Sequence, residues 1–199
     1  GSFMLPVSMG EKYKAIVSTT EGIKKEFSLP EPEANRLALS ITERNGVIHY
    51  TILHTPQKKL SENLYLVAHI RGFLLFIQPI EKEQGAINLQ SVPEGILTLT
   101  ILDGNYLPHS ERLAFVRREN NSVWKLTPDK SSYDSRSPVS LDIHLSDLSG
   151  QPIKGNFSLS VTDNYAIGCD SIGDNILSNL LLTSDLKGYI ETPGYYFKN

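Results

Sequence analysis

Apolar and polar residues alternate along most of this chain in short runs, and turn-forming residues separate the runs. The first two pairs of runs cover residues 13–17 with 23–29 and 37–41 with 47–53. Alternation with a period of two puts every second side chain on the same face of a β-strand. Asn45-Gly46 favours a tight hairpin turn because both residues tolerate positive φ. The pattern therefore predicts antiparallel hairpins.

Residues 64–70 and 73–77 are almost continuously apolar and meet at Arg71-Gly72. Continuous apolarity over this length is typical of strands buried on both faces, so we predict a central strand pair here. Further strands are expected at residues 86–89, 95–102 and 112–116. Only residues 174–182 follow a helical period. The sequence predicts an all-β fold of antiparallel sandwiches, with at most one or two short helices.

A weak internal repeat favours two domains over one. Asp103 and Pro108 precede an alternating run, and Asp147 and Pro152 repeat that spacing before residues 157–161. The polar residues 117–122 suit a boundary. We therefore expect tandem β-sandwiches at 1–118 and 119–199, the second ending in a junction segment. Residues 1–30 are expected to belong in part to a preceding domain, because the start of the chain looks like an excised fragment without a signal peptide.

Composition narrows the classes of protein. Hydrophobic residues make up 40% and charged residues 21%, which is ordinary for a folded globular chain. The net charge is −3 and the 19 Lys and Arg residues are scattered, so no nucleic-acid partner is expected. No apolar run is long enough to span a membrane as a helix. Cys169 is the single cysteine, which excludes an internal disulfide.

Three stretches of the second half carry a recognisable order of motifs. Residues 125–143 contain Asp129-Lys130-Ser131-Ser132-Tyr133, residues 147–153 contain Gly150-Gln151-Pro152, and residues 156–163 form an alternating run that ends in Asp163. This order resembles the macroglobulin-like domains of α2-macroglobulin-type and related bacterial envelope proteins. The Pro-Gly turn typical of that pattern is replaced by residues 134–137, so this turn is expected to differ in type.

Two further stretches extend the resemblance. Residues 62–72, taken with 93–97 and 110–116, and the tail at 175–191 are similar to large Gram-negative proteins in which tandem macroglobulin-like domains precede a TonB-dependent-receptor plug. The resemblance implies immunoglobulin-like sandwiches. It also implies a place in the periplasm or at the outer membrane.

Candidate chemistry is sparse. Thioester macroglobulins use Cys-x-Glu-Gln, whereas Cys169 is followed by Asp170 and Ser171, so no thioester is expected. The histidines are dispersed, and none adjoins a Gly-x-Ser-x-Gly elbow. They are His49, His54, His69, His109 and His144. We expect His49, His69 and His144 to be sheet histidines that face solvent or have partners. We predict no catalytic, cofactor-binding or metal-ligating residues, no cofactor and no enzyme activity.

Two polar or aromatic groups leave alternatives open. Asp163, Asp170 and Asp174, with Asn164 and Asn175, could supply oxygen ligands to a cation such as Ca²⁺, or could form a solvated loop in which Asp174 caps a helix. The aromatic residues near the end could bind a glycan or pack against a following domain. They are Tyr189, Tyr195, Tyr196 and Phe197.

The sequence thus favours a structural or interaction module that spaces or links domains of a cell-envelope protein. Its expected partners are the neighbouring domains of a longer chain. The alternative is a recognition module that binds a protease or a glycan through sandwich loops such as residues 56–62 or 106–111. An enzyme would require a His and a carboxylate to meet from separate strands.

Overall fold

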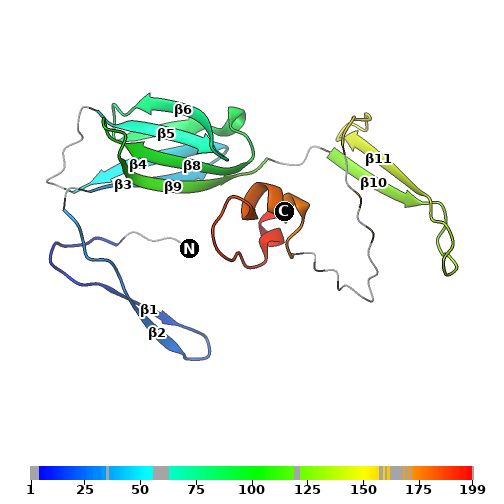
Figure 1. The fold of residues 1–199 in the computed structure, drawn as a ribbon, viewed down its shortest axis with the longest axis horizontal. Coiled ribbons are helices and arrows are strands. Elements are labelled where there is room, and N and C mark those ends of the chain that lie inside the picture. The colour runs from blue at the N-terminus through cyan, green and yellow to red at the C-terminus, as the bar shows by residue number, and fades with distance from the viewer. Residues whose placement is uncertain are drawn as a thin grey trace. The chain divides into compact units, whose positions relative to one another are not determined.

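The computed structural model describes residues 5–34, 36–55, 63–118, 122–156, 159, 161, 168, 170 and 172–198. The fold is all-β, as predicted: these residues form four antiparallel sheets and only short helical turns (Figure 1). The strands are β1 Lys14–Ser18, β2 Lys24–Ser28, β3 Leu37–Arg44, β4 Val47–His54, β5 Tyr65–Ile70, β6 Phe73–Pro79, β7 Gln84–Asn88, β8 Gly95–Leu102, β9 Pro108–Val116, β10 Ser122–Pro128 and β11 Leu141–Asp147. The helical turns are η1 Leu89–Ser91, α1 Ile176–Ser178, η2 Asn179–Thr183 and η3 Pro193–Phe197.

Strands β3 to β9 form a sandwich of two sheets. One sheet has the order β3-β4-β7 and the other β6-β5-β8-β9. Consecutive strands pair in β3-β4, β5-β6 and β8-β9. The chain crosses to the other sheet after β4, after β6 and after β7. Immunoglobulin-like sandwiches divide their strands in the same way, with A-B-E in one sheet and C′-C-F-G in the other. This part of the chain is an immunoglobulin-like sandwich.

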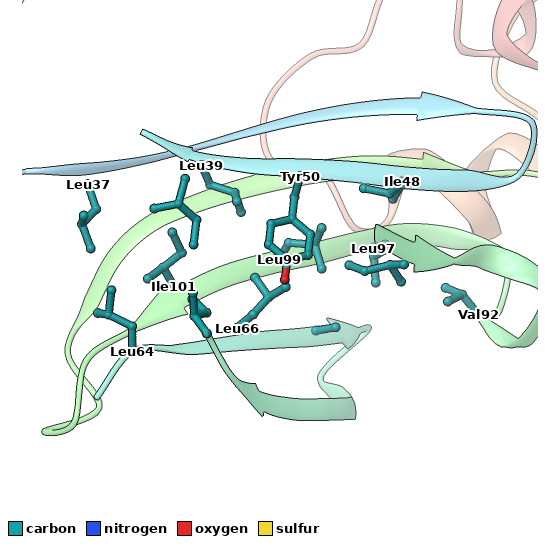
Figure 2. Close-up of a cluster of buried hydrophobic side chains, with 14 of the residues drawn as sticks. Leu37, Leu39, Ile48, Tyr50, Leu64, Leu66, Val92, Leu97, Leu99 and Ile101 are labelled. Atoms are coloured by element: carbon teal, nitrogen blue, oxygen red, sulfur yellow. The ribbon is translucent and has the colours of Figure 1, made fainter. Parts of the chain in front are cut away.

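The core lies between these two sheets because each strand turns alternate apolar residues inward. Figure 2 shows Leu39, Ile48 and Tyr50 of one sheet pointing toward Leu66, Leu97 and Leu99 of the other. The largest fully buried side chains of this core are Leu39, Ile48, Ile52, Leu64, Leu66, Leu97, Leu99 and Ile101. Apolar burial of this kind is the main stabilising term of a sandwich.

Two hairpin turns have the backbone that their residues favour. Asn45 and Gly46 have φ values of 52° and 73° and join β3 to β4, so the predicted hairpin is confirmed. Glu43 Oε1 accepts a hydrogen bond from Gly46 N at 2.8 Å. Arg71 and Gly72 have φ values of 50° and 75° and join β5 to β6 in the same way. Positive φ at both residues matches the twist of the flanking strands.

The predicted central pair at residues 64–77 is half wrong. β5 is central, since it pairs with both β6 and β8, but β6 is an edge strand whose residues Phe73, Leu74 and Ile77 are exposed. Apolarity along a strand does not reveal which of its edges will find a neighbour, because strand order is decided by pairing between distant residues.

The chain divides into two compact units, Gly1–Val116 with Asn179–Tyr189 and Arg117–Ser178 with Ile190–Asn199. Residues Asn179–Tyr189 contact the rest of the first unit in two ways. Leu182 of η2, which packs on β8, is buried, and Arg71 Nε lies 3.2 Å from Asp185 Oδ2. The helical pattern predicted at 174–182 is present as α1 and η2.

The described part of the second unit contains the hairpin β10–β11 and a C-terminal segment. In that segment Gly194 N donates to Ile172 O at 2.8 Å, and a Cβ at Gly194 would lie 2.9 Å from the Ile172 backbone. Arg117 donates to the carbonyl oxygens of Tyr196 and Phe197 at 3.2 and 2.9 Å. The strand predicted at 157–161 falls mainly outside the described residues, and a second sandwich at 119–199 stays a prediction.

Candidate functional site

The histidines occupy separate places in the two units. His54 Nε2 lies 3.0 Å from Glu83 Oε1, and His109 Nε2 lies 3.2 Å from Asp103 Oδ2. His49 and His144 are exposed on strands, as expected. His69 departs from that expectation, because its Nδ1 is buried and has no hydrogen-bond partner. Across the described ranges, no group of three or more His, Cys, Asp or Glu side chains could hold a metal ion.

The acidic residues around 170 serve local structure. Asp170 Oδ1 accepts from Ile172 N at 2.9 Å, and Asp174 Oδ1 accepts from the Ser178 hydroxyl at 2.6 Å. The helix cap is Asn175, whose Oδ1 accepts from Leu177 N and Ser178 N, so the predicted cap at Asp174 is wrong by one residue. Asp163, Asn164 and Cys169 lie outside the described residues.

The internal repeat seen in the sequence is a repeat of loop structure. In the first loop Asp103 Oδ1 accepts hydrogen bonds from Asn105 N at 2.8 Å and Leu107 N at 3.0 Å. The Asp103 backbone accepts from Tyr106 N at 2.9 Å and donates to Leu107 O at 3.1 Å. One carboxylate thus closes a five-residue turn between β8 and β9, as Asx turns do.

The second loop repeats each of these hydrogen bonds. Asp147 Oδ1 accepts from Ser149 N and Gln151 N, both at 2.9 Å. The Asp147 backbone accepts from Gly150 N at 3.0 Å and donates to Gln151 O at 2.9 Å. The left-handed position is Gly150 with φ 84° here and Tyr106 with φ 62° in the first loop. A tyrosine in this region is strained relative to glycine.

These hydrogen bonds lower the pKa of both carboxyls. The largest cause is the Leu107 backbone N–H for Asp103 and the Ser149 hydroxyl for Asp147. A carboxyl with a lowered pKa in the folded state stabilises the fold above its unfolded value near pH 4, and that stabilisation is lost as pH falls through the lowered pKa.

We therefore expect that, in Asp103→Asn, the free energy of unfolding of the first unit falls less steeply as the pH is lowered, so that the acid limb of its pH dependence is flatter. Urea unfolding followed by far-UV circular dichroism between about pH 5 and about pH 2 measures this, because the amide accepts hydrogen bonds but does not titrate in that range. Glu81→Gln, an exposed carboxylate outside the loop, is the control and should leave the acid limb as steep as in the parent chain. An equally steep limb in Asp103→Asn would contradict the prediction.

Asp129 and Tyr133, the two ends of the run Asp-Lys-Ser-Ser-Tyr, hydrogen-bond to each other beside the hairpin β10–β11. Asp129 Oδ1 accepts from the Tyr133 hydroxyl at 2.6 Å and from Ser140 N at 3.0 Å, and the Tyr133 oxygen accepts from Lys130 N at 3.1 Å. The hydrogen bond between them lowers the Asp129 pKa and raises the Tyr133 pKa. The spacing of the motif is thus the spacing that closes this loop.

The hairpin β10–β11 divides its side chains sharply between two faces. Its register pairs Trp124 with Leu145 and Leu126 with Ile143, which places these apolar side chains on one face. Lys125 pairs with His144 on the other, polar face. Trp124 and Leu126 are nevertheless 53% and 56% exposed. The hairpin β1–β2 also exposes Val17 and Phe27 on one face, opposite the Lys14–Glu26 ion pair at 3.3 Å.

Several of these contacts carry no sequence signal that we recognised. The ion pair between Arg71 and Asp185 joins residues far apart in the chain. The hydrogen bonds from Arg117 to the C-terminal carbonyl oxygens also join distant residues. Phe197 also lies under Arg117, 5.7 Å from the guanidinium carbon to the ring centre. Tyr195 and Tyr196 pack edge to face and stay exposed, as does Tyr189.

These loops and the exposed apolar side chains of the two hairpins are surface features of the described part of the chain. No family model, curated protein or solved structure matches the chain. The macroglobulin-like resemblance therefore stays a prediction from the sequence motifs. In the described part of the chain, no helix is both long and apolar enough to cross a membrane.

Proposed function

We propose that this chain is a non-catalytic structural and interaction module of a cell-envelope protein, in the periplasm or at the outer membrane of a Gram-negative bacterium. Its sandwiches would space or link neighbouring domains of a longer chain, including a TonB-dependent-receptor plug. The predicted domains at 1–118 and 119–199 belong to this proposal, as does packing of the aromatic C-terminal residues against a following domain.

The exposure of Trp124, Leu126 and Ile143 on one face of β10–β11 is the observation that supports this function best. A two-stranded hairpin is marginally stable by itself, and an amphipathic hairpin becomes stable when another sheet covers its apolar side. Trp124, Leu126 and Ile143 have the alternation that buries Leu39 and Ile52 in β3 and β4. Such a face suits a module that packs against further β-structure and not one that holds a small substrate.

Trp124 is a built-in probe of this proposal because it is the only tryptophan of the chain. We expect acrylamide to quench Trp124 readily in the present chain, since the side chain is exposed. In a longer chain that carries the neighbouring domains, quenching should fall several-fold and the emission should shift to the blue, because an apolar sheet face would exclude water from the indole.

The matched control moves the indole to the other face of the same strand. Val123 precedes Trp124 on β10, points to the polar face and is similarly exposed. In the double variant Val123→Trp with Trp124→Phe, the indole should stay quenchable in the longer chain. Equal quenching of both variants in the longer chain would reject the proposal that this face is covered.

The alternative, recognition of a protease or glycan through a sandwich loop, has one observation in its favour. Tyr106 is 71% exposed and Leu107 is exposed beside it, on the loop that the Asp103 carboxylate closes. A rigid loop that presents an aromatic side chain suits recognition. A glycan array and a protease pull-down, each repeated with Tyr106→Gly, test this function. Residues 56–62, the other candidate loop, lie outside the described residues.

A further inference from the structure

β6 is an edge strand whose outer side has no neighbour within the described part of the chain. It pairs with β5 alone, at the outer edge of the four-stranded sheet (Figure 1). The backbone N–H and C=O groups on its other side are free to pair with an additional strand. Unpaired edges of this kind template association between chains unless the sequence protects them.

Of the features that usually protect an edge strand, β6 has Pro79 at its C-terminal end and a bulge, but it has no charged residue. Its sequence, Phe-Leu-Leu-Phe-Ile-Gln-Pro, contains no charged residue. The edge strands β3 and β9 do carry charge, at Glu43 and Arg44 and at Glu111 and Arg112, and they are linked to each other through Leu39 N and Ser110 Oγ at 2.9 Å. β7 is uncharged but exposes no large apolar side chain.

A bulge in β6 places two large apolar side chains on the same exposed face. Leu74 lies opposite His69, and Ile77 lies opposite Val67, because the register shifts between Ala68 and His69. His69 and Val67 both point to the outer face of the sheet, so Leu74 and Ile77 do as well. Leu74 is 58% exposed and Ile77 is 50% exposed.

We propose that β6 pairs with β6 of a second copy of this chain, in antiparallel fashion about a two-fold axis. Absence of charge favours a second copy, since two identical β6 strands meet with no charged side chain on either strand. In a register centred between Leu75 and Phe76, Leu74 of each copy lies opposite Ile77 of the other. The two sheets then continue into one, and the interface uses no residue of the hairpin faces discussed above.

Sedimentation velocity of the full chain over about a hundredfold range of concentration tests this pairing, because dimerisation follows mass action. We expect a reversible monomer–dimer equilibrium. In the dimer, the amides of β6 should exchange with deuterium more slowly than in the monomer. A chain that stays monomeric over the whole range overturns the proposal, whether or not another protein binds the same edge.

Ile77→Lys and Leu113→Lys form a matched pair of variants. Both residues lie on the outer face of the same sheet and are 50% and 48% exposed, but Leu113 is on β9, at the opposite edge. Ile77→Lys should raise the dimer dissociation constant about tenfold or more, since an edge lysine blocks strand pairing. Leu113→Lys should leave the constant unchanged. An equal effect of both would show association through the sheet face or through other parts of the chain, and would overturn pairing at β6.

Discussion

Leu99→Ala is expected to lower the free energy of unfolding of the first unit by about 3 kcal/mol, because a fully buried leucine leaves a cavity that the core fills only in part. Leu99 lies on β8, inside the sheet order β6-β5-β8-β9, and has no solvent exposure. Its side chain points into the core between the two sheets (Figure 2). Urea unfolding followed by far-UV circular dichroism measures the change.

Leu113→Ala is the control for this prediction. Leu113 is the same residue type in the neighbouring strand β9, but its side chain is on the outer face and half exposed, so we expect a change below about 0.5 kcal/mol. Trp124 fluorescence adds a second readout, since this residue belongs to the second unit. If the two units unfold separately, as the predicted domains require, Leu99→Ala shifts the circular dichroism transition and leaves the Trp124 transition in place. Similar losses in both leucine variants would show that the core is not where the sandwich places it.

Gly85→Ala is expected to lower the free energy of unfolding by about 2 kcal/mol through overpacking. Gly85 of β7 lies opposite Tyr50 of β4, and the Tyr50 ring lies over it, so that a Cβ at position 85 would overlap the ring. Tyr50 is itself buried in the core, so the ring cannot move aside without disturbing its neighbours. The same unfolding measurement applies.

A double-mutant cycle with Tyr50→Leu separates overlap from a general effect of alanine in a strand. Tyr50→Leu removes the ring that the new methyl group would meet. The double variant should therefore be no less stable than Tyr50→Leu alone, which gives a coupling energy of about 2 kcal/mol. Simple addition of the two single effects would show that the glycine is required for another reason.

Local features of the fold were predictable from short stretches of sequence. Asn45-Gly46 specified a hairpin turn because few residue pairs tolerate two positive φ values in succession. The alternation in residues 37–41 and 47–53 specified which side chains share a face. The spacing from Asp103 to Pro108 and from Asp147 to Pro152 marked two loops, and the structure shows that the aspartate closes both. Each of these features depends on residues that are near neighbours in the chain.

The function-related features depended on tertiary structure. Apolarity marked β6 as a strand, yet only the strand order of the sheet made it an edge with Leu74 and Ile77 exposed.

By itself, the sequence determined the all-β class, the hairpins and the aspartate loops, since these follow from backbone preferences and the period of side-chain alternation. The tertiary structure alone decided the strand order, the return of residues 179–189 to the first unit through Leu182 and Asp185, and the contact of Tyr50 with Gly85. These arise from pairing and packing between residues distant in the chain, where many arrangements bury similar apolar area and the complementarity of the whole core selects one.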